Sequence, residues 1–124
     1  MTQPLALVLY EKLLPGSQIV NRLQDLNYRA QAVGDPSLLV ESAEQAKPLL
    51  VLADLQSGRD DVLRALTRLK QNPATKHLPV IAFAAEDTPD LRTSAVSAGV
   101  TLLVSDVAVL NHLPQLLDQA LQVE

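Results

Sequence analysis

Short runs of consecutive hydrophobic residues alternate along this chain with segments in which hydrophobic residues recur every three or four positions. The runs have the length of β-strands, and their hydrophobic residues do not alternate with polar ones. Such strands are typical of a parallel sheet that helices cover on both faces. The sequence therefore predicts buried strands at Leu5–Leu9, Leu49–Ala53, Pro79–Ala84 and Val100–Val104, and a weaker strand at Arg29–Val33.

Helical patterns follow these strands, and polar or small residues mark where the helices begin and end. Ser17, Asp35 and Asn111 are predicted N-caps, because a short polar side chain can accept a free backbone N–H of the first turn. Gly99 is predicted to follow the end of the fourth helix, where a left-handed backbone is common. The predicted helices are Ser17–Leu26, Pro36–Lys47, segments around residues 61–72 and 89–98, and a last helix after Asn111.

The order of elements is (βα)5, which is an α/β fold. Right-handed crossovers leave few arrangements for five parallel strands, and the flavodoxin-like order 2-1-3-4-5 is a common one. Residues 1–124 have the size of a single domain, and no repeat or linker divides them. The fourth helix has few inward candidates, namely Leu91, Ala95 and Val96, so we expect it to be the most weakly anchored helix.

Composition excludes several classes of function. Of the 124 residues 48% are hydrophobic, but the aromatic ones are limited to Tyr10, Tyr28 and Phe83, so the core must be aliphatic. The net charge is −4 without a visible basic stripe, and aromatic platforms for stacked bases are missing, so we expect no nucleic-acid partner. The chain has no cysteine, which excludes disulfides and thiolate sites.

Signals for membrane insertion and secretion are also missing from the sequence. No hydrophobic run approaches the roughly 18–20 residues that span a bilayer, and the first residues lack the basic region of a secretory signal. We therefore expect a cytoplasmic protein with no membrane partner. His77 and His112 have no acidic residues at metal-ligand spacing and no serine partner, so we expect both on the surface.

Three segments resemble the receiver domains of bacterial response regulators. The most specific is Leu69–Ile81, which matches the family's helix end, proline loop and Pro-Val-Ile strand entry. Pro48–Leu55 is similar to the strand that delivers the phosphate-accepting aspartate, and Ala95–Val100 is similar to the Ala-Gly-Ala segment before the fifth strand. Together with the order of elements, the resemblance covers essentially the whole chain and implies the receiver fold.

The resemblance also implies a site at the carboxyl ends of the strands. Receivers place an acidic pair after the first strand to hold Mg²⁺, and a nucleophilic aspartate after the third. A hydroxyl after the fourth strand and a lysine after the fifth bind the phosphoryl group. In this chain the acidic pair corresponds to Tyr10 and Glu11, and the nucleophile to Asp54. The hydroxyl position falls on Ala84, or on Ala85 if the register shifts by one. The lysine position falls on Asp106, which follows Ser105.

These substitutions predict a pseudo-receiver, which acts by protein–protein interaction without efficient phosphorylation. Glu11, Asp54 and Asp106 would lie close together, and the resemblance assigns no basic residue to this site to balance their charges. A phosphoryl group would add about two further negative charges. Each missing electrostatic stabiliser costs roughly 10²–10³ in rate. We expect no enzymatic activity and no required cofactor.

Three alternatives stay open. The first is a genuine phosphoacceptor modified at Asp54, with Mg²⁺ bound at low affinity by Glu11 and Asp54 and with Lys12 swinging toward the site. In the second, Asp54 only opens a loop by accepting backbone N–H groups two residues on. The third is a cofactor-binding flavodoxin-like domain, which is disfavoured because Glu11–Gly16 is not a Ser/Thr/Gly-rich phosphate loop.

Finally, the resemblance implies a face for partners. Receivers signal through their fourth helix, fifth strand and fifth helix, often as dimers. In this chain that face would include Arg92, Leu103 and Val107. We expect protein partners in signal transduction, with a homodimer through this face as one form of that interaction.

Overall fold

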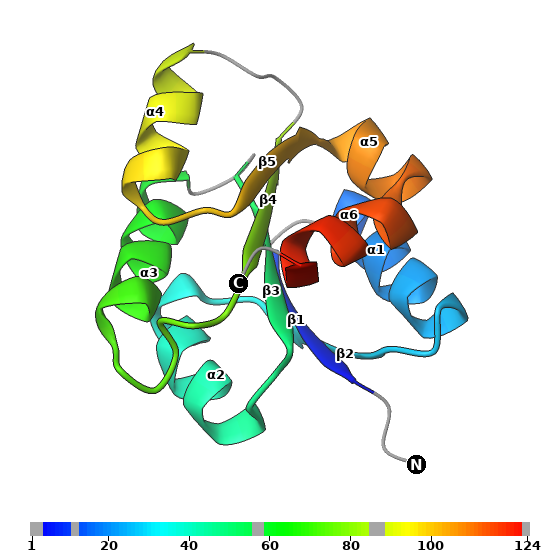
Figure 1. Cartoon of the computed structure of the whole chain (residues 1–124), viewed down its shortest axis with the longest axis horizontal. Coiled ribbons are helices and arrows are strands. Elements are labelled where there is room, and N and C mark those ends of the chain that lie inside the picture. The colour runs from blue at the N-terminus through cyan, green and yellow to red at the C-terminus, as the bar shows by residue number, and fades with distance from the viewer. Residues whose placement is uncertain (1–3, 11–12, 56–58, 85–88, 123–124) are drawn as a thin grey trace.

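A five-stranded parallel sheet lies between two layers of helices in the computed structural model, which describes residues 4–10, 13–55, 59–84 and 89–122 (Figure 1). The order across the sheet is β2-β1-β3-β4-β5, and each neighbouring pair is parallel. The predicted α/β fold and strand order are thereby confirmed. The strands are β1 (Leu5–Leu9), β2 (Arg29–Val33), β3 (Leu50–Asp54), β4 (Val80–Ala84) and β5 (Leu102–Ser105).

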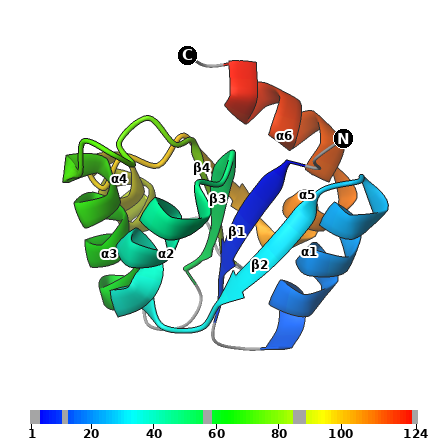
Figure 2. The same ribbon diagram turned by 90° about the horizontal axis from the view of Figure 1, so that it is seen from below.

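The helices divide evenly between the two faces of the sheet (Figures 1 and 2). One face is covered by α1 (Leu13–Asp25), α5 (Asp106–Asn111) and α6 (Leu113–Gln122). The other is covered by α2 (Leu39–Ala46), α3 (Arg59–Gln71) and α4 (Pro89–Ser97), with a 3₁₀ turn, η1 (Pro36–Leu38), before α2. Among the described residues, no helix combines the length and the apolar character needed to cross a membrane.

The core forms on both faces because successive side chains of a strand point to opposite sides. Leu7 of β1 packs toward α2, α3 and α4, whereas Val8 packs toward α1, α5 and α6. Every residue of β1, β3 and β4 is buried, and Phe83 heads the set of largest fully buried side chains. The strands are therefore covered on both sides, as their unbroken hydrophobic runs predict.

Of the N-caps predicted for the first two helical segments, the first is wrong and the second is confirmed. Helix α1 begins at Leu13, four residues before Ser17, so Ser17 is not its N-cap. Pro15 falls in the first turn, where proline is tolerated because those N–H groups have no helical partner. Asp35 is the N-cap of η1 as predicted. Its carboxylate accepts hydrogen bonds from the hydroxyl of Ser37 at 2.8 Å and from the backbone N–H of Ser37 at 3.0 Å. These bonds lower the pKa of Asp35.

Three strands start later than predicted: β3 and β4 by one residue, and β5 by two. The shift of β5 follows from how α4 ends. The N–H of Val100 donates to the carbonyl of Ala95, and the N–H of Gly99 donates to that of Val96, each at 3.0 Å. Val100 therefore completes the helix end and does not begin the strand, while Gly99 has the left-handed conformation (φ 89°) predicted for it.

The predicted last helix is present as α6, but the sequence did not predict α5, which precedes it; Asn111 is the last residue of α5 and not an N-cap. Pro114 explains the break, because it lacks the N–H that would bond to the carbonyl of Leu110 in a continuous helix. That carbonyl instead accepts Nε of Arg22 from α1 at 3.3 Å. A hydrogen bond between distant segments thus compensates the interruption.

Lys70 and Gly99 connect the end of α3 to the turn between α4 and β5. The ammonium group of Lys70 donates to the carbonyl of Lys76 at 3.3 Å and to that of Leu78, and burial lowers the pKa of Lys70. The stem of Lys70 passes close to Gly99, where an added Cβ would lie 2.5 Å from Cγ of Lys70. Glycine is thus required at this position both for its backbone conformation and for space.

We predict that Gly99→Ala destabilises the protein, by about 1–2 kcal/mol for the left-handed backbone and further through the clash with Lys70. Lys70→Ala should relieve part of that clash, so the double variant should be more stable than the sum of the single changes by roughly 0.5 kcal/mol or more. Urea unfolding of the four proteins measures this coupling. Strictly additive free energies of unfolding would contradict the contact.

Candidate functional site

The positions that the family resemblance assigns to a phosphorylation site lie at one edge of the sheet. Because all five strands are parallel, the residues that end them gather at their carboxyl ends. In order along this edge are Tyr10 after β1, Asp54 at the end of β3, Ala84 at the end of β4 and Ser105 at the end of β5. The structure therefore brings four of the predicted positions to the same edge.

Asp54 is the last residue of β3 and belongs to the sheet. It pairs in register with Phe83, and the N–H of Leu55 donates to the carbonyl of Phe83 at 2.9 Å. Asp54 is only 2% exposed and its Oδ2 is fully buried. Removing a carboxylate from water is costly unless hydrogen bonds or a cation compensate it, so this position differs from an ordinary solvated loop aspartate. The predicted loop-opening bond two residues on involves residue 56, which lies outside the described residues.

The neighbours of Asp54 along the edge are largely apolar. Ala84 is 6% exposed, packs in the cluster under α2, α3 and α4, and has no side-chain group that could bind a phosphoryl oxygen. Tyr10 is half-buried against the cluster on the α1 side. Tyr10 and Asp54 each come one residue after the paired residues Leu9 and Ala53. A phenol and a methyl group thus stand where receivers have a carboxylate and a hydroxyl.

Ser105 is both the last residue of β5 and the N-cap of α5. It pairs in register with Ala84, and its hydroxyl oxygen accepts the N–H of Ala108 at 3.0 Å. A helix consequently starts at Asp106, the position that the resemblance assigns to the lysine.

Other predicted groups lie outside the described part of the chain: Glu11, Lys12, Ala85 and the side chain of Asp106. Within the described ranges, no group of three or more His, Asp or Glu side chains could hold a metal ion. Mg²⁺ often binds through one or two carboxylates with water completing its shell. The buried carboxylate of Asp54 fits one such ligand, and Glu11 is the second that the sequence offers.

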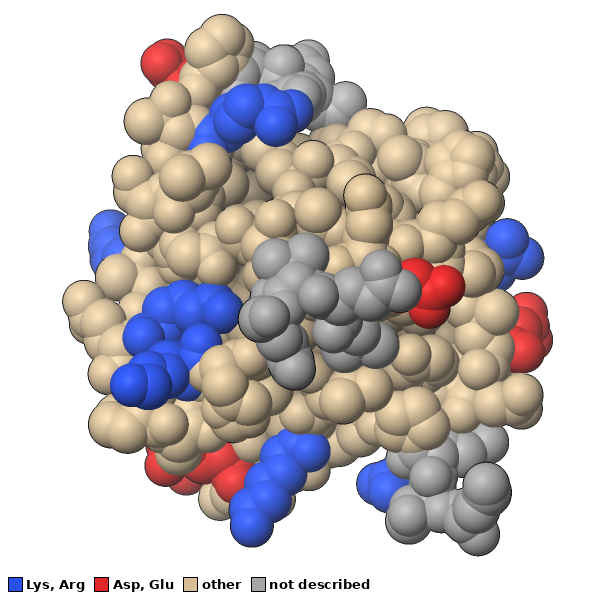
Figure 3. Space-filling model, in the orientation of Figure 1, with Lys and Arg blue, Asp and Glu red and all other residues tan. Residues whose placement is uncertain are grey.

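Of the residues predicted for a partner face, Arg92 is exposed on α4, Leu103 is half-buried on β5 and Val107 is 62% exposed on α5. Figure 3 shows no charged side chain of the described residues on the surface over β5 and α5, while basic side chains lie over α4. The predicted surface histidines, His77 and His112, are both exposed.

Sequence reasoning missed Val96, which it assigned to the inner side of α4. Val96 is 70% exposed and is the most exposed large hydrophobic side chain among the described residues. The buried residues of α4 are Leu91 and Ala95, four positions apart, and Ala98 in the turn that follows is also buried. Val96 follows Ala95 by one position, about 100° around the helix, so the helical period alone could have placed it outside.

No protein-family model and no curated protein matches this chain. Among solved structures, it is similar to the chemotaxis protein CheY4 of Vibrio cholerae, with 14% identity, 96% of this chain and 99% of that chain covered, and a TM-score of 0.86. A response regulator from Thermotoga maritima is 17% identical, with 98% and 99% covered and a TM-score of 0.82. The signal receiver domain of an HD domain-containing protein from Pseudomonas fluorescens is 18% identical, with 98% and 96% covered and a TM-score of 0.83.

The chain has the receiver fold. Identities of this size establish the fold alone, so the chemistry of the site has to be argued from the residues that occupy it. In this fold Asp54, at the position that the resemblance assigns to the acceptor, is buried, while Ala84, which pairs with Ser105, is aliphatic.

We predict that Ser105→Ala destabilises the protein by about 1 kcal/mol, because it removes the N-cap of α5. Ser94→Ala is the matched control: Ser94 is exposed on α4 and is not a helix cap, so its loss should change stability by less than about 0.5 kcal/mol. Thermal and urea unfolding measure both variants. Equal stability of the two would show that the Ser105 hydroxyl does not hold α5.

Proposed function

We propose that this chain is a receiver-type signalling domain of a two-component system that acts through protein contacts without efficient phosphorylation. The observation that carries the proposal is Ala84, an aliphatic buried residue at the end of β4 where receivers use a hydroxyl. Ser105, which pairs in register with Ala84, has a hydroxyl, but its oxygen accepts the backbone N–H of Ala108 and caps α5. Because one electrostatic stabiliser is typically worth about 10²–10³ in rate, its loss makes phosphoryl transfer to Asp54 slow.

Charge acts in the same direction as the missing hydroxyl. The resemblance expects a lysine where the sequence has Asp106, so a cation that would offset phosphoryl oxygens is replaced by an acid. Two like charges about 4 Å apart repel by roughly 1 kcal/mol in water, and several-fold more when partly buried. A phosphoryl group on Asp54 would add about two negative charges to this acidic edge.

A Mg²⁺-dependent phosphoacceptor is the second candidate, and the buried carboxylate of Asp54 is the observation that favours it. Glu11 and Asp54 would hold the metal, which when bound supplies positive charge beside the phosphoryl oxygens. A carboxylate oxygen of Asp54 would form the bond to phosphorus while the leaving group of the phosphodonor departs with its electron pair.

The two candidates differ in how the protein responds to a small phosphodonor. With Mg²⁺ and acetyl phosphate, we expect the intact mass of the wild-type protein to stay unchanged. A variant that restores the missing groups, Ala84→Thr with Asp106→Lys, should gain a phosphoryl adduct at least about 10² times faster. Adding Asp54→Asn to that variant is the control and should abolish the adduct. Rapid, Asp54-dependent modification of the wild type would establish the second candidate instead.

We propose α4, β5 and α5 as the face that contacts the partner. Val96 on α4 and Val107 on α5 are the two most exposed large hydrophobic side chains among the described residues, at 70% and 62%. Between these helices runs β5, an edge strand of half-buried residues. Exposed apolar groups that border an uncharged surface are typical of protein interaction sites. The proposed role is a cytoplasmic one, with a second copy or another signalling protein as partner and without catalysis by the chain.

Self-association through this face can be measured directly. Val107→Glu, alone or with Val96→Glu, should weaken a homodimer about tenfold or more, because it places charges against an apolar contact. Leu38→Glu is the matched control, since Leu38 is an exposed hydrophobic residue in η1, far from α5. Sedimentation equilibrium over a range of concentrations gives the dissociation constants. A wild-type chain that stays monomeric at every concentration would reject the homodimer and leave another protein as the partner.

A further inference from the structure

Strand β5 forms one edge of the sheet, so one side of its backbone has no neighbouring strand. Natural proteins often protect such an edge with charged residues or proline, because an open strand can pair with another chain. Residues 100–105 include neither, and Figure 3 shows no charged side chain of the described residues over β5. The other edge strand, β2, carries the exposed Arg29 and Gln31. The edge at β5 is therefore the less protected of the two.

Hydrogen bonds in the sheet determine which backbone groups of β5 face inward. The carbonyls of Pro79 and Phe83 accept N–H groups of β3 at 3.0 and 2.9 Å, so the even-numbered residues of β4 face β5. In a parallel ladder, a residue bonds to the two residues that flank its partner. The partners of Leu102 and Val104 are Ile81 and Phe83. The N–H and C=O groups of Leu102 and Val104 therefore face β4.

The backbone groups between these face the open edge, because the C=O and N–H of a trans peptide point in opposite directions. They are the C=O of Thr101, the N–H and C=O of Leu103, and the N–H of Ser105. The other groups of the two flanking residues are already used. The N–H of Thr101 donates to the carbonyl of Val80 at 2.9 Å, and Ser105 is the N-cap of α5, so its carbonyl belongs to the first turn of that helix.

These outward groups are complementary to themselves under a two-fold axis. If two copies of β5 lie antiparallel with Leu103 opposite Leu103 of the second copy, these residues exchange both of their N–H···O bonds. In the same register, the N–H of Ser105 meets the C=O of Thr101 of the other copy. A shift by two residues in either direction loses half of these bonds, because the N–H of Thr101 or the C=O of Ser105 would be required.

We propose that two copies of this chain pair through β5 in this register and form one continuous sheet. The inference rests on the proposed function, since it names the partner at the α4–β5–α5 face and how it binds. The net charge of −4 makes two copies repel each other over much of their surface, which favours contact at an uncharged edge.

Apolar side chains accompany the pairing on both faces of the sheet. Leu103 belongs to the core cluster under α4, whereas Leu102 and Val104 pack against the cluster under α5. In the proposed register, the Leu103 side chains of the two copies are neighbours, and Leu102 lies opposite Val104, so no like charges meet. Val96 on α4 and Val107 on α5 extend the apolar surface on the two faces.

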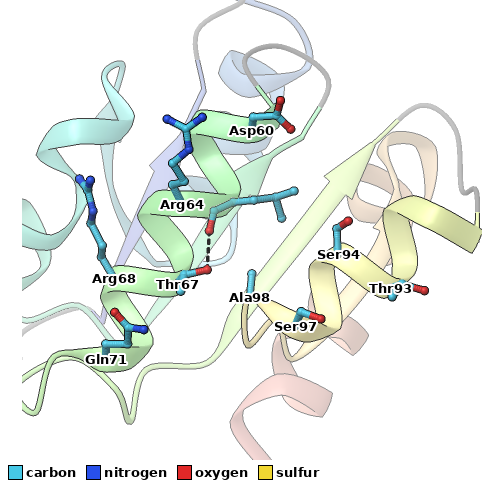
Figure 4. A pocket seen from close by; sticks show the side chains of 10 residues that line it. Asp60, Arg64, Thr67, Arg68, Gln71, Thr93, Ser94, Ser97 and Ala98 are labelled. Atoms are coloured by element: carbon cyan, nitrogen blue, oxygen red, sulfur yellow. Dashed lines mark hydrogen bonds between the residues drawn. The ribbon is translucent and has the colours of Figure 1, made fainter.

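Helix α4 uses other residues for its contact with α3. Thr93, Ser94 and Ser97 line an open groove of about 600 Å³ between the two helices (Figure 4). Val96 is not part of that lining, although it is 70% exposed. Its side chain can therefore contact a second copy without disturbing the α3–α4 contact.

Disulfide cross-linking tests the register, because the chain has no cysteine of its own. In Leu103→Cys the substituted residues of two copies would lie opposite each other, with about 5.5 Å between Cα atoms, which suits a disulfide. This variant should form a covalent dimer under mild oxidation. Leu102→Cys and Val104→Cys should each cross-link poorly, because equivalent residues would be roughly 7–8 Å apart. A mixture of the two should cross-link well. No covalent dimer of Leu103→Cys, or equal yields from the mixture and from each variant alone, would overturn the register.

Proline tests the backbone bonds. Leu103→Pro removes an outward N–H without removing a bond to β4, whereas Leu103→Ala shortens the side chain and keeps the N–H. In sedimentation equilibrium, Leu103→Pro should weaken self-association about tenfold or more relative to Leu103→Ala. Ala30→Pro is the control at the other edge and should change it less than about twofold. The N–H of Arg29 donates to the carbonyl of Pro4 at 2.7 Å, so the N–H of Ala30 faces away from β1.

The outcomes separate this inference from the proposed function. Self-association that Val107→Glu weakens, but that is equal in Leu103→Pro and Leu103→Ala, would keep the α4–β5–α5 face and overturn the strand pairing. A wild-type chain that is monomeric at every concentration would also overturn the pairing, while leaving the face to another protein. Thermal unfolding checks that each variant is folded, and if Leu103→Pro is not, the cross-linking yields decide.

Discussion

Three strands of the sheet, β1, β3 and β4, are buried along their whole length, and this burial determines where everything else can lie. A strand that is apolar on both sides needs a layer of helices on each, and parallel crossovers then carry the chain back to the same end every time. All loops after strands must therefore meet at one edge. Asp54 is positioned at that edge by the same burial that stabilises the core, which is why an aspartate can end a strand while only 2% exposed.

Burial constrains β5, one of the two edge strands, less than it constrains β1, β3 and β4. All four residues of β5 are half-buried, and a helix begins directly after it. Ser105 therefore ends a strand and caps a helix at once, and its hydroxyl is held by the N–H of Ala108. The consequence for function is direct: the one hydroxyl next to Ala84 in the sheet register already has a structural role.

Patterns within the sequence predicted what depends on local chemistry and failed where a distant contact decides. Unbroken hydrophobic runs predicted the strands, and residue type predicted the Asp35 cap and the turn at Gly99. Pro114 interrupts the helix between α5 and α6. The hydrogen bond from Arg22 to the carbonyl of Leu110, which compensates this break, joins residues 88 apart in the chain, so no local pattern predicts that bond. At the site, the edge positions of Asp54 and Ala84 follow from the strand order, whereas the cap made by Ser105 became visible only with the backbone of α5.

The distribution of positive charge sets the carboxyl edge of the sheet apart from α3. In the described part of the chain, Lys70 binds carbonyl groups at the amino end of β4, while Arg64 and Arg68 extend from the side of α3 that faces away from α4 (Figure 4). The position expected for the site lysine carries Asp106. The position of the site lysine thus carries an acid, while basic side chains are concentrated on α3.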